Sequence, residues 1–289
     1  MDIFKKLERI RKELLVLSLL AFLLAVLGFL ALALIPSAAA GILFSLLAWL
    51  SFLLTLGMIR LRVSAYKRLY GQHMMAQILS TEFEKVTYDP KGALEEDLVA
   101  STDTIMMGNT FLSAEKRSGE YRSVKMTMAD VALKNLLGRT SVTYFDGTWM
   151  VFTFPKAFRR SLEIKEKSFL NAQKPQGENP ELDRVMVGSE ELARFFKIYG
   201  ESEALARDFL SKSLEEAVIT LNYELPGDLM LYFHKDRLHI ACHGRRLQYE
   251  PPLLGKLHRE EIEQVLLSDC RTVKRFLDTV LSDSSLFLD

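Results

Sequence analysis

The stretch that decides the architecture is LLVLSLLAFLLAVLGFLALALIPSAAAGILFSLLAWLSFLLTLGMI, residues 14–59. It contains no charged residue and is interrupted once, at Pro36–Ala40. The first part, Leu14–Ile35, has 22 residues, and the second, Gly41–Ile59, has 19. A helix that crosses the roughly 30 Å hydrocarbon core of a bilayer needs about 20 residues. We therefore expect two transmembrane helices joined by a turn.

Two other interpretations of this stretch are weaker. A helical hairpin buried in a soluble core seldom runs this long without a charge. A cleaved signal peptide would have a shorter apolar region, and a soluble chain rather than a second apolar segment would follow it. The transmembrane hairpin is therefore the preferred interpretation of residues 14–59.

Basic residues flank the two apolar segments on their outer sides and are absent from the turn between them. They are Lys5, Lys6, Arg9, Arg11 and Lys12 before the first segment, and Arg60, Arg62, Lys67 and Arg68 after the second. Cytoplasmic loops carry an excess of Lys and Arg. We therefore expect a multi-pass protein with its N- and C-termini in the cytoplasm. Two cysteines in the whole chain, too few for a disulfide framework, agree with that placement.

These signals divide the chain into four parts. They are a basic cytoplasmic N-terminus (1–13), a transmembrane hairpin (14–59, with spans 14–35 and 41–59), a juxtamembrane helix (60–86) and a cytosolic α+β domain (87–289). A heptad-like apolar stripe follows the juxtamembrane helix through Ala65, Leu69, Gln72, Ala76, Leu79 and Phe83. We favour a helix that packs on its own domain, and the alternative is a helix that pairs with another protomer.

The charge of the chain is balanced in total but uneven along its length. Residues 60–174 hold 18 Lys and Arg against 13 Asp and Glu, and residues 175–289 hold 14 against 21. A basic membrane-proximal half suits an anionic cytoplasmic leaflet, and ordinary surface scatter is the alternative. No basic stripe with interleaved aromatic residues occurs, so we expect no nucleic-acid partner.

Period-two alternation over Tyr121–Met128 predicts a half-buried strand. Asp146-Gly147 separates Ser141–Phe145 from Thr148–Phe154, and this pattern predicts a tight hairpin. Further strands are predicted at Leu162–Glu166, Glu216–Glu224, Leu229–His234 and Arg237–His243.

Helices are predicted from Ser189 to Gly200, from Ser202, and from about Leu257 to Leu281, and a polar loop is predicted over 171–180. The apolar stripe of the last helix comprises Ile262, Leu266, Val273, Phe276, Leu277 and Val280. The predicted class is therefore α+β: a transmembrane helical hairpin, then a cytosolic antiparallel-sheet domain with a C-terminal capping helix.

Several short motifs follow one another in a characteristic order. They are Tyr88-Asp89-Pro90-Lys91-Gly92, Phe145-Asp146-Gly147-Thr148-Trp149, Phe154-Pro155-Lys156-Ala157-Phe158, Asn179-Pro180-Glu181-Leu182-Asp183-Arg184-Val185 and Leu238-His239-Ile240-Ala241. Behind two apolar spans, this order resembles the bacterial membrane proteins catalogued as domain of unknown function 3137. The resemblance covers nearly the whole chain and implies a bacterial inner-membrane protein, without an activity, cofactor or catalytic residue.

The usual signatures of nucleotide binding, metalloproteases, serine hydrolases and dithiol chemistry are missing from the sequence. The densest group of metal-ligand types is His234, His239, Cys242 and His243. On one strand His239 and His243 would lie about 13 Å apart, and Cys242 would face the other side. We therefore expect two exposed histidines and a buried free cysteine, with no metal, cofactor or catalytic residue assigned.

One basic cluster is a candidate for contact with the membrane surface. It surrounds Phe158 and comprises Lys156, Arg159, Arg160, Lys165 and Lys167. Phosphate and headgroup oxygens attract such side chains, whereas the alternative is a solvated strand end.

The favoured function is a membrane-tethered interaction or scaffold domain. The alternatives are a domain that contacts lipid headgroups or senses the envelope and, less favoured, an enzyme with an unrecognised site. The expected partners are the lipid bilayer and a protein partner or second copy, contacted through the spans or the juxtamembrane helix.

Overall fold

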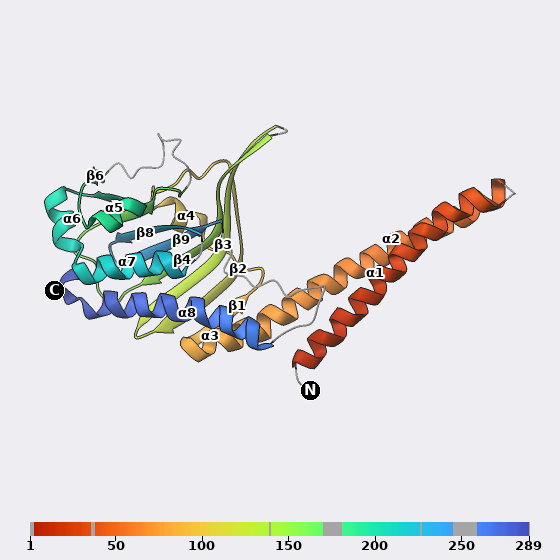
Figure 1. The fold of residues 1–289 in the computed structure, drawn as a ribbon, viewed down its shortest axis with the longest axis horizontal. Coiled ribbons are helices and arrows are strands. Elements are labelled where there is room, and N and C mark those ends of the chain that lie inside the picture. Colours follow the sequence, from red (N-terminus) through yellow and green to blue (C-terminus); the bar gives the residue numbers. More distant parts are fainter. Residues whose placement is uncertain are drawn as a thin grey trace. The chain divides into compact units, whose positions relative to one another are not determined.

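The computed structural model describes residues 3–35, 38–138, 140–169, 181–225, 227–244 and 259–288. The chain divides into two compact units (Figure 1). The helical unit comprises Met1–Met75 with Glu250–Glu261, and the sheet unit comprises Ala76–Tyr249 with Ile262–Asp289. The loop predicted over 171–180, and Pro36 and Ser37 of the turn between the spans, lie outside the described residues.

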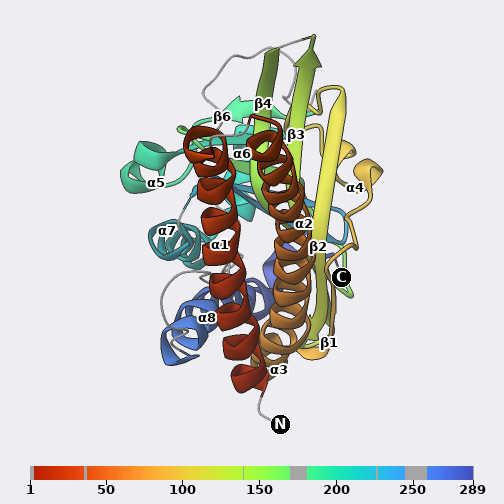
Figure 2. The same cartoon turned by 90° about the vertical axis from the view of Figure 1, so that its right-hand side faces the viewer.

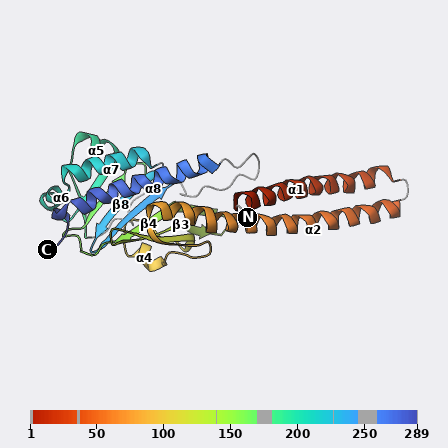
Figure 3. The ribbon, with the colours of Figure 1, turned by 90° about the horizontal axis from the view of Figure 1, so that it is seen from below.

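Two long antiparallel helices form the helical unit: α1, Ile3–Leu34, and α2, Ala38–Tyr70 (Figures 1 and 3). Both are long and apolar enough to cross a membrane. In their most apolar windows only 17% and 11% of the residues are buried, whereas a core helix of a soluble protein would be mostly buried. The predicted pair of long apolar helices is therefore confirmed.

A seven-residue repeat of buried positions joins the two helices. Leu7, Leu14 and Ala21 of α1 are almost inaccessible, and Gly28 continues the repeat. A Cβ atom on Gly28 would lie 3.0 Å from the indole nitrogen of Trp49, so the glycine lets the indole of α2 approach closely. A seven-residue repeat of this kind is typical of the contact seam between two long packed helices.

The sheet unit contains one antiparallel sheet of nine described strands, in the order β1-β2-β3-β4-β9-β8-β5-β7-β6. The strands are β1 (Glu84–Asp89), β2 (Thr110–Tyr121), β3 (Val124–Leu137), β4 (Thr140–Thr153), β5 (Leu162–Glu166), β6 (Asp183–Val185), β7 (Phe196–Gly200), β8 (Asp228–His234) and β9 (Arg237–His243). The late hairpin β8–β9 fills the gap between β4 and β5. This arrangement confirms the predicted α+β class.

One face of the sheet is covered by α7 (Lys212–Glu224) and α8 (Arg259–Ser282), which lie side by side in Figure 3. Side chains from both helices join the strands in one core, including Leu214, Val218, Leu221, Val273, Phe276, Leu277 and Val280. The last four belong to the predicted stripe of the C-terminal helix, which confirms that this helix caps the sheet. The side chains of Ile262 and Leu266 lie outside the described residues.

A second core covers the opposite face of the sheet. Leu94, Val99 of α4 (Glu96–Ala100) and Ile105 pack there against Trp149 and Tyr232. As a result the central residues of β8 and β9 are inaccessible on both faces, and no residue from Leu229 to Phe233 is more than 1% exposed. Antiparallel strands with one solvated face would alternate between buried and exposed residues.

Helix α3 (Ala76–Glu82) packs on the sheet unit through Leu79, and Phe83 joins the same core. Glu82 accepts hydrogen bonds from Lys274 at 2.8 Å and Arg271 at 2.9 Å, both on α8. The Lys274 ammonium and then the Arg271 guanidinium lower the pKa of the Glu82 carboxyl below its usual value. This part of the apolar stripe therefore packs on the chain's own domain, and β1 begins at Glu84, two residues after α3 ends.

Serine side chains begin three short helices. The hydroxyls of Ser189, Ser202 and Ser211 accept hydrogen bonds from the backbone N–H groups three residues later. They cap α5 (Glu190–Phe195), α6 (Glu203–Phe209) and α7, as the free N–H groups of a first turn require. The helices predicted at Ser189 and Ser202 are confirmed. The first is shorter than predicted, because the chain from Phe196 to Gly200 forms β7.

The strand predicted at Glu216–Glu224 is wrong, because this segment belongs to α7. Its β-branched residues Val218-Ile219-Thr220 favour a strand locally. However, Leu214, Val218 and Leu221 lie on one helical face, and burying that face on the sheet outweighs the local preference.

The hairpin predicted at Asp146-Gly147 is also wrong. Strand β4 runs without a turn through both residues, which pair with Ala132 and Val131 of β3. The turn lies between Leu137 and Thr140, where Gly138 has a φ of +62°. Gly147 serves close packing instead: a Cβ atom there would lie 2.0 Å from the carbonyl oxygen of Cys242 on β9.

We expect Gly147→Ala to lower the free energy of unfolding by about 2 kcal/mol, because the new methyl group meets backbone that must move. For a domain of this size the apparent melting temperature should fall by about 5 °C. Tryptophan fluorescence during heating of the full-length protein in detergent measures the change.

Gly138→Asn is the matched control, because Asn tolerates positive φ and no atom lies within 4 Å of the position that a Cβ atom would take at Gly138. It should melt within about 2 °C of the unsubstituted protein. Equal melting temperatures for Gly147→Ala and the unsubstituted protein would contradict the assigned β4–β9 register.

Candidate functional site

Phe158, at the centre of the predicted basic cluster, is buried, and the charged side chains around it lie in different surroundings. Phe158 is 4% exposed, and its ring centroid lies 4.9 Å from that of Phe154 and 5.0 Å from that of Phe287. Its backbone also forms a bridge with Phe287 near the end of the chain. The aromatic contact therefore holds this segment against the core and sends the neighbouring charged side chains to different surroundings.

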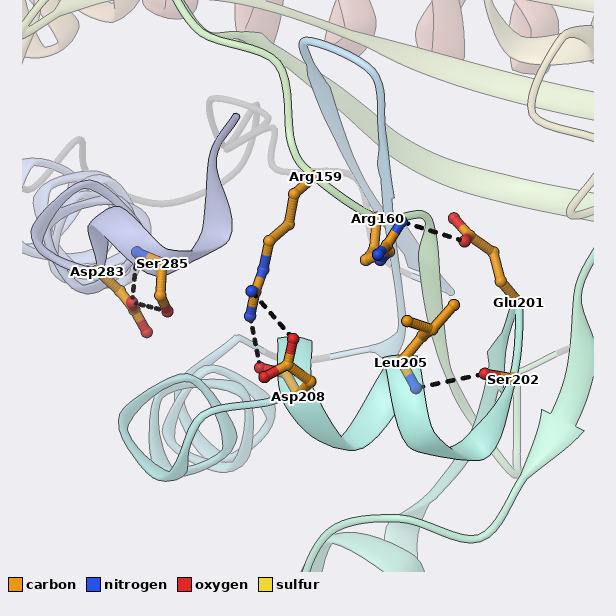
Figure 4. Close-up of polar contacts among 8 residues, drawn as sticks. All are labelled: Arg159, Arg160, Glu201, Ser202, Leu205, Asp208, Asp283 and Ser285. Carbon is orange, nitrogen blue, oxygen red and sulfur yellow. Dashed lines mark hydrogen bonds and ion pairs between the residues drawn. The ribbon is translucent and has the colours of Figure 1, made fainter. Parts of the chain in front are cut away.

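Two of the predicted cations, Arg159 and Arg160, lie against α6 (Figure 4). Arg159 Nη1 lies 3.0 Å from Oδ2 of Asp208, and Nη2 donates to the Asp208 carbonyl oxygen at 2.7 Å. Arg160 Nη1 lies 4.0 Å from Oε2 of Glu201. Glu201 precedes α6 and Asp208 lies in its last turn. The two arginines therefore bind opposite ends of the same short helix.

The third predicted cation with a carboxylate partner, Lys165, lies on the other face of the sheet. Its Nζ is 2.6 Å from Oε1 of Glu163 and donates to the Thr104 carbonyl oxygen at 2.6 Å. Lys156 and Lys167 are exposed. The five predicted residues thus do not share one surface.

The histidine and cysteine group is only partly as predicted. Cys242 is buried and is not part of a disulfide, as predicted. The prediction that His239 is exposed is wrong, because it is 3% exposed and its Nδ1 accepts a hydrogen bond from Trp149 Nε1 at 3.2 Å. The second core layer covers the face to which His239 points. His243 Nδ1 accepts a hydrogen bond from the Asp146 backbone N–H at 3.2 Å.

Burial lowers the pKa of His239 to about 3, and the Arg237 charge contributes in the same direction. A neutral imidazole matches its role as acceptor for the Trp149 indole. Across the described ranges of the chain, His, Cys, Asp and Glu side chains form no group of three that could hold a metal ion. His239 and Trp149 are therefore a structural pair.

The structure places exposed apolar side chains on a projecting hairpin that the sequence analysis missed. Strands β3 and β4 continue as a two-stranded ribbon beyond the strands that flank them (Figure 2). Towards the β3–β4 turn, the pairing of β2 with β3 ends at Thr110 and Lys134, and that of β4 with β9 ends at Gly147 and His243. Leu136, Leu137 and Val142 on this ribbon are 50%, 59% and 47% exposed. We call the described residues 134–138 and 140–143 the β3–β4 tip.

One backbone edge of the tip is covered by a side chain. Asn109 Nδ2 donates to the Leu136 carbonyl oxygen at 2.9 Å, and its Oδ1 accepts from the Leu136 N–H at 2.8 Å. The side-chain amide of Asn109 thus occupies both backbone hydrogen-bonding groups of Leu136, as a residue of an additional strand would. It therefore blocks pairing of this edge with another chain.

A buried charged group lies at the root of the same hairpin. Arg117 on β2 and Asp130 on β3 are 1% and 6% exposed, with Nη2 and Oδ1 3.8 Å apart. Thr148 Oγ1 on β4 donates to Asp130 Oδ1 at 3.3 Å. The group ties three strands together where the ribbon leaves the sheet. Removing one member of such a buried pair leaves an uncompensated charge and is costly.

The sequence contains a signal for the tip. Two leucines precede Gly138, and β-branched and hydroxyl residues follow it, which is a hairpin pattern with apolar residues at the turn. The Asp146-Gly147 pattern nearby is the stronger local signal. Only the pairing of β9 with β4 shows why that dipeptide lies within a strand.

An antiparallel α+β sheet unit and two helices able to cross a membrane define the general class of this protein. The family described as "Protein of unknown function (DUF3137)" matches residues 143–280 of the chain. The match confirms the family resemblance drawn from the sequence.

Comparison with solved structures gives a distant similarity to the mycobacterial trehalose monomycolate transport factor A, TtfA. The two chains share 11% sequence identity and a TM-score of 0.40, over 72% of this chain and 94% of that chain. No curated protein matches the chain.

We expect acidification to destabilise the sheet unit through His239. Unfolded chains bind a proton on this histidine near pH 6.5, whereas the folded protein does so only near pH 3. Stability is therefore highest above pH 6.5 and falls as the pH drops from there toward 3. At pH 5 the loss from this residue is about 2 kcal/mol.

His239→Gln is expected to remove this share of the pH dependence, because an amide oxygen can still accept the Trp149 hydrogen bond without binding a proton. Unfolding of the full-length protein in detergent at pH 7 and pH 5 measures the difference. His73→Gln, at an exposed residue of the π-helical turn Gly71–Met75, is the control and should retain the full dependence. An unchanged dependence in His239→Gln would refute the role of His239.

Proposed function

We propose that this chain is a membrane-anchored docking protein. Its two apolar helices hold it in the bacterial inner membrane with both termini in the cytoplasm, and its sheet unit binds a partner protein there. The basic residues on both outer flanks of the spans support this orientation. The family resemblance supports the bacterial membrane.

The observation that carries the proposal is the exposed apolar surface of the β3–β4 tip. Leu136, Leu137 and Val142 are among the few large apolar side chains of the sheet unit that are exposed in the described ranges. Leu137 and Val142 lie on one face of a ribbon that contributes little to the two cores, and Leu136 lies on its other face. Clustered exposed apolar residues mark interaction sites, whereas single ones are ordinary.

The pairing across the ribbon favours a protein over lipid acyl chains as the partner. Leu136 lies opposite Ser141, Leu137 opposite Thr140, and Asn135 opposite Val142. Each cross-strand pair thus combines one apolar and one polar side chain. Hydrocarbon would leave the hydroxyl and amide groups without hydrogen-bond partners, whereas protein interfaces contain both kinds of surface.

The root of the ribbon supports rigid presentation of the tip. The buried Arg117–Asp130 pair and the Thr148 hydrogen bond connect β2, β3 and β4 just below it. Asn109 holds the β3 edge at Leu136. A preorganised element loses less conformational entropy on binding, which favours affinity.

Headgroup contact through the predicted basic cluster is the weaker alternative. Arg159, Arg160 and Lys165 already have carboxylate partners, so binding a phosphate would require these ion pairs to open or share. Of the five predicted cations, this leaves only Lys156 and Lys167, and two charges are a small positive surface for binding headgroups.

Photo-crosslinking in cells tests the docking proposal. A benzophenone amino acid at Leu137 is expected to give a discrete protein adduct, and one at Met186, which is 69% exposed elsewhere on the sheet unit, is not. An adduct of twice the chain's mass would identify a second copy as the partner.

Leu137→Ser with Val142→Ser should weaken binding of the crosslinked partner at least about tenfold, because exposed aliphatic side chains at an interface centre contribute about 1 kcal/mol or more each. Met186→Ser with Tyr223→Ser is the matched control on other exposed apolar side chains and should leave binding unchanged. Lipid adducts alone at Leu137, or equal binding by both double variants, would overturn the proposal.

A further inference from the structure

A groove runs between α1 and α2 at the end of the helical unit that carries the basic flanks. Its volume is about 980 Å³. Four cations line it, Lys5, Arg9 and Lys12 from α1 and Arg62 from α2, together with apolar side chains that include Val16 and Met58. All of these residues belong to the helical unit, and the groove is independent of the β3–β4 tip.

The lining changes from charged to apolar at the level where the charge-free spans begin. Lys12 and Arg62 lie two and three residues outside Leu14 and Ile59, which is about 3 and 5 Å along a helix. Val16 lies about 3 Å inside the span by the same rise. The headgroup layer of one leaflet is roughly 5–8 Å thick. Lys12, Arg62 and Arg9, the last about 8 Å outside Leu14, therefore fall at headgroup depth, and Val16 falls at the top of the hydrocarbon. Lys5 lies further out, about 14 Å from Leu14 along the helix.

The charges of the groove are not balanced by its own carboxylates. Glu13 lies between two arginines, 3.3 Å from Arg9 Nε and 3.5 Å from Arg62 Nη1. Glu8 is paired with Arg11, whose Nε and Nη2 donate to it at 2.6 and 2.9 Å.

Lys5 and Lys12 form no ion pair with any residue that the structure describes. They lie seven residues apart, and Arg9 lies between them at spacings of four and three, so all three share one side of α1. The groove thus keeps a net positive charge on one side of α1.

We propose that this groove binds one anionic phospholipid of the bilayer. Its phosphate lies among Arg9, Lys12 and Arg62, with Lys5 at the outer end of the groove, and the first methylene groups of an acyl chain lie against Val16 and Met58. Charge complementarity selects an anionic over a zwitterionic headgroup, and the apolar floor selects a lipid over free phosphate. Basic residues that only orient a protein in the membrane would need no groove.

Native mass spectrometry of the full-length protein in mild non-ionic detergent tests this proposal. Phosphatidylglycerol and phosphatidylcholine with the same acyl chains are added in equal amounts. We expect phosphatidylglycerol to bind at least about tenfold more strongly, and an excess of inorganic phosphate to leave it bound, because the acyl contacts persist. Equal binding of the two lipids, or displacement by phosphate, would overturn the proposal.

Two double variants separate the groove from general charge. Lys5→Gln with Lys12→Gln is expected to weaken phosphatidylglycerol binding about 25-fold, at about fivefold for each lysine. Arg60→Gln with Arg68→Gln removes the same charge from exposed positions of the same flank that do not line the groove. The second pair should change binding less than about threefold, since its charge is not in the groove. Equal losses in both pairs would refute a specific site.

A third variant tests the groove without changing charge. Val16 is 66% exposed and lies at the depth where the hydrocarbon begins. A tryptophan side chain is compatible with this depth, so Val16→Trp fills the apolar floor of the groove without disturbing the membrane span. It is expected to weaken phosphatidylglycerol binding about tenfold by excluding the acyl chain. Unchanged binding would overturn the assigned position of the lipid.

Discussion

Burial of the central strands on both faces is the constraint on which the sheet unit depends. Helices α7 and α8 cover one face, and α4 with the segment that follows it covers the other. Every polar group carried into this double layer must find a partner inside the protein. The Trp149–His239 hydrogen bond and the Arg117–Asp130–Thr148 group are two such solutions.

The same constraint explains why the hairpin ribbon stands apart. Strands β3 and β4 are longer than their neighbours, so their ends continue past both cores. The apolar residues on the ribbon therefore have no internal core to enter. Gly147 and the buried ion pair hold the strands in register within the sheet, below the tip.

Charge is used differently in the two units. In the sheet unit, Arg159 and Arg160 form ion pairs at the two ends of α6, and Lys165 forms an ion pair with Glu163. In the helical unit the cations of the α1–α2 groove outnumber the carboxylates, and two lysines have no ion pair in the described chain. Equal totals of basic and acidic residues in the sequence conceal this difference.

The sequence by itself determined the two long apolar helices, the α+β class, the capping helix, the strands β8 and β9 and the serine-capped starts of α5 and α6. These features depend on length, period and local hydrogen bonding, which are readable along one chain. Tertiary structure decided that Glu216–Glu224 is a helix, that Asp146-Gly147 lies within a strand, and that His239 is buried. It also decided that the predicted cations lie on separate surfaces. Each of these depends on which distant segment packs against the residue, and a local pattern does not contain that information.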